Sequence, residues 1–254
     1  MFRPRVIPVL LLKGLGLVKS IGFKDYRYIG DPINAVKLFN DLKADELVFL
    51  DILATKEKRS IPLKFIGKIG DEANMPFSVG GGIRTLQNIK EIVNAGAEKV
   101  IINSFAVENP EFIRQASDVF GSSTISVSID VKKNLFGKQQ VYTHGGTKSA
   151  GTDPVIFAKL MEQKGAGEIL INSIHRDGLM SGYDLELIKR VSEAVTIPVI
   201  AVGGAGSLND FRSAINYSYA SAVAAGSMFV YHGTRNAVLI NYPFQQELTK
   251  IFGN

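Results

Sequence analysis

Pro76-Phe-Ser-Val-Gly-Gly-Gly-Ile83 and Pro198-Val-Ile-Ala-Val-Gly-Gly-Ala-Gly206 are two stretches with one pattern, a short apolar run followed by clustered glycines. The pattern predicts a β-strand that ends in a loop whose backbone can take positive φ and approach a ligand closely. The converging amides of such a loop can bind a phosphate. Because the stretches lie about half a chain apart in equivalent register, they indicate an internal duplication that binds two phosphates, or one substrate with a phosphate at each end.

Around these stretches, short apolar runs alternate with amphipathic segments of helix length. Eight strands are predicted near residues 5–12, 46–51, 76–79, 99–103, 124–130, 168–173, 198–202 and 222–225. Helices are predicted near residues 31–42, 61–73, 85–95, 110–120, 154–164, 184–195 and 208–217. This βα order in 254 residues favours an α/β fold of the (β/α)₈ TIM-barrel class, built as a two-fold repeat of half-barrels, over an open doubly wound sheet.

Three expectations follow for the organisation of the chain. No break in composition divides it, so residues 1–254 are expected to form a single domain. Residues 14–19 are expected to form a glycine-bearing loop. The long segment 132–151 is expected to form a β-hairpin over the mouth of the fifth strand.

The composition narrows the classes of function. The net charge is +5, but the cations are scattered and form no basic stripe, so nucleic-acid binding is not expected. The chain has no cysteine, and its three histidines lack metal-ligand spacing, so we expect neither a metal nor a cofactor. Lys13 interrupts the N-terminal apolar run, which excludes a signal peptide, and no run has the length of a membrane span. A cytoplasmic protein that does not contact membranes is predicted.

The active site of a TIM barrel lies at the C-terminal ends of its strands. Polar residues predicted at those ends are Asp51, Asn103, Ser104, Asp130, Asn172, His175, Asp177 and Ser227. Asp130 closes the apolar run 125–129 and is the candidate general base at the mouth of the barrel. A carboxylate that caps a neighbouring loop has the same sequence pattern, so both interpretations stay open.

The opposite end of the barrel carries a second set of candidates. Four charged residues, Arg5, Glu46, Lys99 and Glu168, stand at the starts of predicted strands. They could form a ring of alternating charge across the bottom of the barrel, or they could be separate solvated charges, which are common at strand starts.

Motifs along most of the chain identify a family. They include Asp45-Glu-Leu-Val-Phe-Leu-Asp51, Val79-Gly-Gly-Gly-Ile83, Ala106-Val-Glu-Asn-Pro110, Ser128-Ile-Asp130, Arg176-Asp-Gly178 and Gly203-Gly-Ala-Gly206. Together, over about residues 5–231, they resemble the HisF family, the cyclase subunits of imidazole glycerol phosphate synthase. The resemblance implies a TIM barrel that binds a glutaminase subunit, HisH, on its N-terminal face. Ammonia from glutamine then passes through the barrel to a substrate with two phosphates.

The resemblance also assigns roles to residues. One phosphate site would comprise Gly82, Asn103 and Ser104, and the other would comprise Gly178, Gly203, Gly204, Gly226 and Ser227. Arg5, Glu46, Lys99 and Glu168 match the family's gate at the ammonia entrance. Asp130 matches one of the two catalytic aspartates of the cyclase.

The second catalytic aspartate of the family falls on Leu11, whose side chain cannot transfer a proton. With leucine at this position, the chain resembles a subgroup of HisF-like proteins that are encoded together with surface-polysaccharide enzymes. There the barrel and a HisH-like glutaminase supply ammonia to an ATP-dependent sugar amidotransferase, which forms an acetamidino group on a nucleotide sugar. The leading hypothesis is therefore an ammonia-conducting subunit that has lost cyclase chemistry.

Three alternatives remain from the sequence. The chain could be a working cyclase of histidine biosynthesis in which His175 or Asp177 replaces the missing acid. It could be a scaffold that binds a phosphorylated small molecule without conducting ammonia. The sister isomerase HisA shares the fold and the phosphate loops, but the four charged residues of the gate argue against it.

Overall fold

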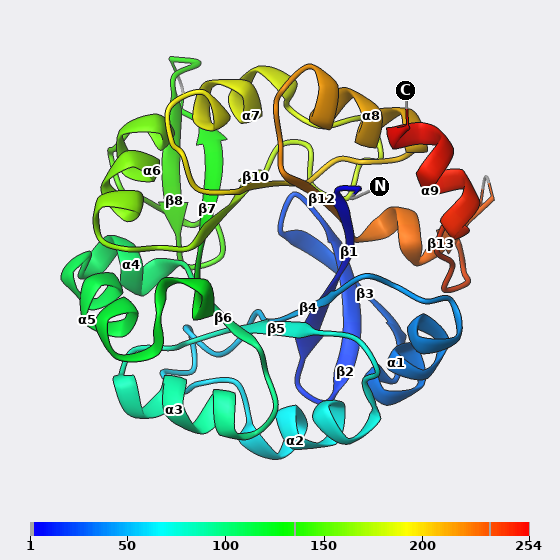
Figure 1. Cartoon of the computed structure of the whole chain (residues 1–254), viewed down its shortest axis with the longest axis horizontal. Helices are drawn as coiled ribbons and strands as arrows, with labels where there is room; N and C mark the ends of the chain where they lie inside the picture. The colour runs from blue at the N-terminus through cyan, green and yellow to red at the C-terminus, as the bar shows by residue number, and fades with distance from the viewer. Residues whose placement is uncertain (1–2, 135, 234, 254) are drawn as a thin grey trace.

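Eight parallel strands close into a barrel, as the sequence predicted (Figure 1). The computed structural model describes residues 3–134, 136–233 and 235–253, so Met1, Phe2 and Asn254 of the predicted domain lie outside the described residues. The barrel strands are β1 (Arg5–Lys13), β4 (Leu47–Asp51), β5 (Phe77–Gly80), β6 (Lys99–Ile102), β7 (Ile125–Lys133), β10 (Glu168–Ser173), β11 (Val199–Val202) and β12 (Ala222–Ala225). Each strand pairs in parallel with the next, and β12 pairs with β1 to complete the circle.

Helices surround the barrel on its outside (Figure 1). They are α1 (Pro32–Asp41), α2 (Leu63–Glu72), α3 (Leu86–Asn94), α4 (Ser104–Glu108), α5 (Glu111–Phe120), α6 (Pro154–Gln163), α7 (Leu185–Ser192), α8 (Leu208–Asn216) and α9 (Gln245–Phe252). The sequence did not predict the short α4 or the C-terminal α9. No helix among the described residues combines the length and the apolar character needed to cross a membrane.

Side-chain caps explain where several helices begin. Asp31 accepts a hydrogen bond from the amide of Asn34, and Thr85 accepts one from the amide of Asn88, each satisfying an amide that has no partner within its helix. Asp153 caps α6 in the same way and is followed by a proline, which fits the first helical position. These caps set the helix starts within one or two residues of the predicted positions.

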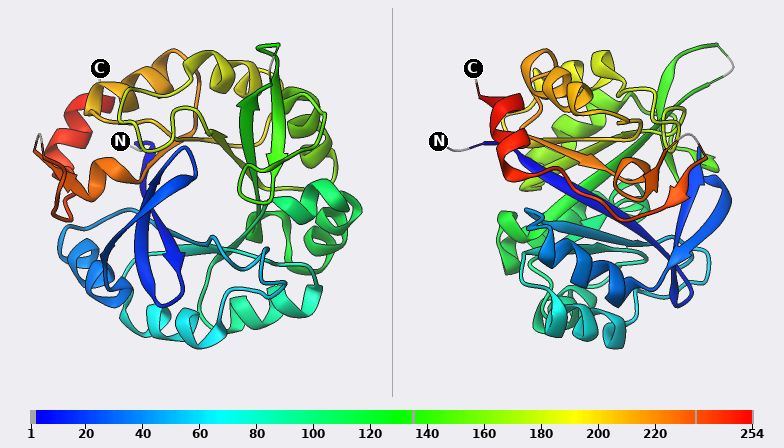
Figure 2. Two further views of the ribbon diagram at one scale, coloured as in Figure 1. Left: turned by 180° about the vertical axis from the view of Figure 1, so that it is seen from behind. Right: turned by 90° about the vertical axis from the view of Figure 1, so that its right-hand side faces the viewer.

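Two hairpins extend the barrel at the C-terminal ends of its strands, on the face opposite the two termini (Figure 2). The predicted hairpin at residues 132–151 is present, because β7 continues into antiparallel β8 (Gln139–Thr143) and β9 (Lys148–Ser149). The loop predicted at residues 14–19 is wrong. There β1 turns at Gly14 into antiparallel β2 (Gly16–Ile21) and β3 (Lys24–Gly30), which we call the lid hairpin. A short antiparallel pair, β13 (Tyr231–His232) and β14 (Ala237–Val238), follows β12.

The apolar core has two separate parts. The larger part lies between the strands and the helices. The smaller part fills the barrel interior and consists of Ile7, Val9, Val48, Ile101, Leu170, Ile200, Ala222 and Ala224. Leu11, Leu50 and Val202 pack against it from the mouth of the barrel. We call these eleven side chains the inner column; they separate the two polar ends of the barrel.

Candidate active site at the barrel mouth

A cavity of about 750 Å³ opens at the C-terminal ends of the strands. Its floor is the mouth end of the inner column, and its walls come from the loops that follow the strands. The lid hairpin adds Lys19, Ser20, Phe23 and Tyr26 to the lining. The cavity has the volume and the mixed polar and apolar lining of a small-molecule site.

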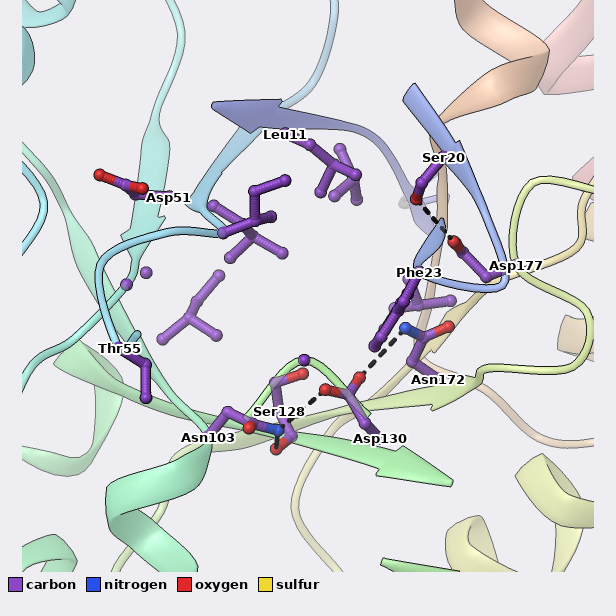
Figure 3. A pocket seen from close by; sticks show the side chains of 18 of the residues that line it. Leu11, Ser20, Phe23, Asp51, Thr55, Asn103, Ser128, Asp130, Asn172 and Asp177 are labelled. Atoms are coloured by element: carbon purple, nitrogen blue, oxygen red, sulfur yellow. Dashed lines mark hydrogen bonds between the residues drawn. The ribbon is translucent and has the colours of Figure 1, made fainter. Parts of the chain in front are cut away.

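Asp130 lies at the centre of the polar wall (Figure 3). Its two carboxylate oxygens accept hydrogen bonds from the amide groups of Asn172, at 3.1 Å, and Asn103, at 3.1 Å. Burial raises the pKa of Asp130 to about 7; the two amides partly offset burial, whereas the negative charge of Asp177 adds to it. Asp130 can therefore gain or lose a proton near neutral pH, as a general acid or base requires.

Lys19 and Asp177 form a second charged cluster in the same cavity. The Lys19 ammonium donates a short hydrogen bond to the carbonyl oxygen of Val9 and is buried. Burial lowers the pKa of Lys19 to about 8, against the attraction of Asp177. Burial raises the pKa of Asp177 to about 6, opposed by Lys19 and by the hydroxyl of Ser20. Two buried groups and the half-buried Asp177 thus have pKa values shifted toward neutrality at the mouth.

The lid hairpin is docked over this cavity. The amide of Gly22 donates to the carbonyl oxygen of Asp177, at 3.0 Å, and the Ser20 hydroxyl donates to the Asp177 carboxylate, at 3.4 Å. The ring of Phe23 lies next to Gly146 in the loop that follows β8, where an added Cβ would be 3.1 Å from the ring. The hairpin is therefore held by this loop and by the loop that carries Asp177, and it closes one side of the mouth.

Leu11 occupies the mouth end of β1, on the opposite side of the cavity from Asp130 (Figure 3). It pairs with Leu50 of β4 and Val18 of the lid hairpin and packs on the inner column. The position where a second carboxylate would face Asp130 is apolar in this chain.

The predicted phosphate-binding residues also gather at the mouth. Gly82, Asn103, Ser104, Gly178, Gly203, Gly204, Gly226 and Ser227 all line the cavity. Several of the glycines have a further reason to lack a side chain. A Cβ at Gly178 would lie 2.1 Å from the Ser20 carbonyl oxygen, and one at Gly226 would lie 2.3 Å from the Lys19 ammonium. Phosphate binding by their amides stays a prediction.

Other candidates from the sequence have different positions. Asp51 lines the cavity but is committed to its own loop, because it pairs with Arg59 and accepts hydrogen bonds from the amides of Leu53 and Ala54. His175 lies outside the main cavity, in a separate cavity of about 490 Å³, where its ring accepts a hydrogen bond from the amide of Lys133. Residues 3–134, 136–233 and 235–253 contain no cluster of side chains that could hold a metal ion.

At the other end of the barrel, the four predicted charges meet in one ring. Arg5 bonds to Glu46 and, at 2.8 Å, to Glu168. Lys99 lies 3.1 Å from Glu168 and 4.0 Å from Glu46. The glutamate side chains are only 4% and 7% exposed, so the interpretation as separate solvated charges is wrong.

Hydroxyls complete the ring, since Ser78 donates to Glu46 and Ser126 donates to Glu168. Burial opposes ionisation of Glu168, but the charge of Lys99 and the hydrogen bonds from Arg5 and Ser126 outweigh it and lower the pKa of Glu168.

Comparison with known proteins agrees with this geometry. A family model described as "Histidine biosynthesis protein" matches residues 5–235. A relative from Leptospira interrogans, provisionally named imidazole glycerol phosphate synthase subunit HisF, is 46% identical over 253 residues, covering 99% of this chain and 100% of the relative. The chain belongs to the HisF family.

Two further HisF relatives differ in how they are named. One from Pseudomonas aeruginosa, provisionally named subunit hisF2, is 44% identical over 243 residues, covering 96% of this chain and 97% of the relative. One from Alkaliphilus metalliredigens, named imidazole glycerol phosphate synthase subunit HisF, is 45% identical over 232 residues, covering 91% of this chain and 92% of the relative. HisF proteins with either form of name therefore resemble this chain to a similar degree.

Sequence reasoning missed several residues of this HisF mouth. Lys19 was assigned to a loop and Phe23 was given no assignment, although both line the cavity. Their signal was weak: Gly14 and Gly22 mark two turns, but the strands between the turns are short and carry no strict alternation. Ser128 was missed because it lies inside an apolar run, where its orientation depends on the register of the strand.

Asp130→Asn is expected to stabilise the fold with a characteristic pH dependence. The carboxyl group has a pKa of about 7 in the fold and an ordinary value of 3.8 outside it, so the folded protein loses stability as pH rises from about 4 to 7. The variant lacks this loss and should exceed the wild type by up to about 4 kcal/mol above pH 7, with no such gain below pH 4. Urea unfolding at several pH values measures the difference. Asp118→Asn, at an exposed position, is the control. If the free energy of unfolding has the same pH dependence in the wild type and in Asp130→Asn, the raised pKa of Asp130 is contradicted.

Gly178→Ala is expected to release the lid hairpin. The added methyl group would meet the Ser20 carbonyl oxygen at 2.1 Å, so the two backbones must move apart next to the hydrogen bond from Gly22 to Asp177. Amide hydrogen exchange across β2 and β3 should become at least about tenfold faster than in the wild type. Gly151→Ala is the matched control, because Gly151 also has positive φ but open space around its Cβ. If amide hydrogen exchange across β2 and β3 is equally fast in Gly178→Ala and Gly151→Ala, backbone strain explains the effect and the contact with the lid hairpin does not.

Proposed function

We propose that this HisF-family barrel conducts ammonia from a HisH-like glutaminase at its N-terminal face and has lost cyclase chemistry. The ammonia would serve an ATP-dependent amidotransferase that acts on a nucleotide sugar, as in surface-polysaccharide biosynthesis. One observation carries the proposal: Leu11 replaces a proton-transfer group at the mouth, whereas the ring of Arg5, Glu46, Lys99 and Glu168 is intact.

The ring is suited to admit a small neutral molecule. Two cations and two anions neutralise one another, and hydroxyls satisfy the remaining carboxylate oxygens. Such a closed set of pairs blocks the barrel bottom to ions, while a partner that rearranges one pair can open it. Buried ion pairs add little net stability to a fold, so stability alone does not account for the ring.

The inner column favours ammonia over ammonium. Its eleven side chains are aliphatic, and an isolated ammonium ion in such surroundings loses its hydration without compensation. Neutral ammonia loses much less. The column therefore supports transfer of the form of ammonia that a glutaminase releases and that an amidotransferase uses as its nucleophile.

Loss of cyclase chemistry follows from the pairing of acid and base. The resemblance to HisF implies a cyclase with two proton-transfer groups, each of which contributes about 10²–10⁴-fold to the rate. Asp130 is present, but the facing side chain is that of Leu11.

A working cyclase is the second candidate, and one observation favours it. Asp177 lines the same cavity as Asp130, and its pKa is raised by burial to about 6, a value suited to a general acid. His175 is a poor replacement, because it lies in the separate cavity.

Purified protein given the cyclase substrate of the family and ammonium salt is expected to show no turnover above that of Asp130→Asn. The side chain of Leu11 cannot complete the acid–base pair. Substrate consumption and product formation by chromatography measure the rate, and Leu11→Asp tests whether one carboxylate restores activity. Turnover in the wild type that disappears in both Asp130→Asn and Asp177→Asn would establish the working cyclase.

Lys99→Leu is expected to uncouple the glutaminase from product formation. The change leaves Glu168 with one cationic partner in a buried site, where loss of a partner costs about 3–5 kcal/mol, so the ring should rearrange. In the complex with glutaminase and amidotransferase, glutamine-dependent product should fall or ammonia should leak, while ammonium salt still supports product. Equal loss with both nitrogen sources would indicate a general structural defect. No loss with either would support the scaffold alternative.

A further inference from the structure

One strand carries polar side chains into the barrel interior from the ring to the mouth. On β7, Ser126, Ser128 and Asp130 occupy every second position and therefore face the same side of the sheet. Ser126 is fully buried, and its hydroxyl donates to Glu168 of the ring. Ser128 and Asp130 line the mouth cavity (Figure 3). We call Ser126 and Ser128 the serine row.

The neighbouring strands show that the serine row faces the inner column. In the register of β7 with β10, Ser126 pairs with Glu168, Ser128 with Leu170 and Asp130 with Asn172. On the other side, Ser126 pairs with Ile101 of β6. Leu170 and Ile101 both belong to the inner column. The row is therefore a polar strip along one wall of an otherwise aliphatic interior.

The two hydroxyls have different hydrogen bonding. Ser126 is committed to Glu168, at 2.8 Å. The Ser128 hydroxyl makes no hydrogen bond with any group in the described part of the chain, although its carbonyl oxygen accepts one from Asn103. Ser128 is half-exposed and lines the mouth cavity, so its hydroxyl is open to a small polar molecule in that cavity.

We propose that the serine row is the hydrogen-bonding path by which ammonia crosses the inner column, from Glu168 at the ring to Asp130 at the mouth. This inference rests on the proposed function as an ammonia conduit. It assigns the route to one strand and gives Ser126 and Ser128 the role of binding ammonia in transit.

The spacing of the row fits this role. Alternate residues of a strand lie about 6.6 Å apart, and two hydrogen bonds of about 3 Å span nearly that distance. One ammonia molecule can therefore leave one hydroxyl as it reaches the next. A serine hydroxyl both donates and accepts, so it can accept a hydrogen from ammonia or donate to its lone pair. Because the hydroxyls are neutral, they do not convert ammonia into a trapped ammonium ion.

The test measures how much glutamine-derived nitrogen reaches product in the complex with glutaminase and amidotransferase. Escaped ammonia is removed continuously by glutamate dehydrogenase with 2-oxoglutarate and NADH, and the ratio of product to oxidised NADH compares delivered with escaped nitrogen. Ser128→Ala should lower the ratio by about fivefold, as expected for one lost net hydrogen bond, and the double variant Ser126→Ala with Ser128→Ala should lower it further. Glutaminase turnover and product formation from saturating ammonium salt should be unchanged in Ser128→Ala. Ser128→Thr keeps the hydroxyl and should restore coupling.

Ser218→Ala is the matched control, because Ser218 is fully buried and hydrogen-bonded but outside the barrel interior. Coupling in both row variants equal to that of the wild type and of Ser218→Ala would overturn the serine row while leaving the conduit intact. If the dehydrogenase abolishes glutamine-dependent product in the wild type, all of the ammonia passes through solution. That result would overturn the conduit itself. The Ser128 hydroxyl makes no hydrogen bond to the ring. A loss of coupling in Ser128→Ala alone therefore reports on the path and not on damage to the ring.

Discussion

Closure of the parallel sheet is the constraint on which the rest of the structure depends. β1 pairs with β12 on one side and β4 on the other, so every residue of the strand must face either the helices or the interior. The same strand then supplies Arg5 to the ring and Leu11 to the mouth. The two polar ends and the apolar segment between them are thus fixed by one register, and a change in that register would disrupt all three together.

The barrel itself could be predicted because its signals are local. Apolar runs, capping residues such as Asp31 and Thr85, and glycines after strands each reflect the chemistry of a few neighbouring residues. The lid hairpin could not, because β2 and β3 depend on contacts with distant loops, including the bond from Gly22 to Asp177. The positions of the polar strand-end residues followed from the fold class alone, since parallel strands bring their ends to one face.

The site was predicted less completely than the fold, for a physical reason. A glycine at a strand end has the same sequence pattern whether a ligand or another part of the protein approaches its backbone. At Gly178 and Gly226 the structure shows protein atoms within the space of a Cβ. The burial of the four charges at the strand starts could not be predicted for a different reason. Their burial depends on all four converging, which no single position reveals, and mutual neutralisation then replaces the hydration that each loses.

Leu11 also affects the stability of the barrel mouth. Two carboxylates facing each other across a poorly hydrated cavity repel, and one of them must hold a proton or lose stability. A leucine removes that repulsion and adds apolar contact with Leu50 and the inner column. Leucine at this position therefore favours a stable mouth. A carboxylate in its place would surrender the apolar contact and add repulsion toward Asp130.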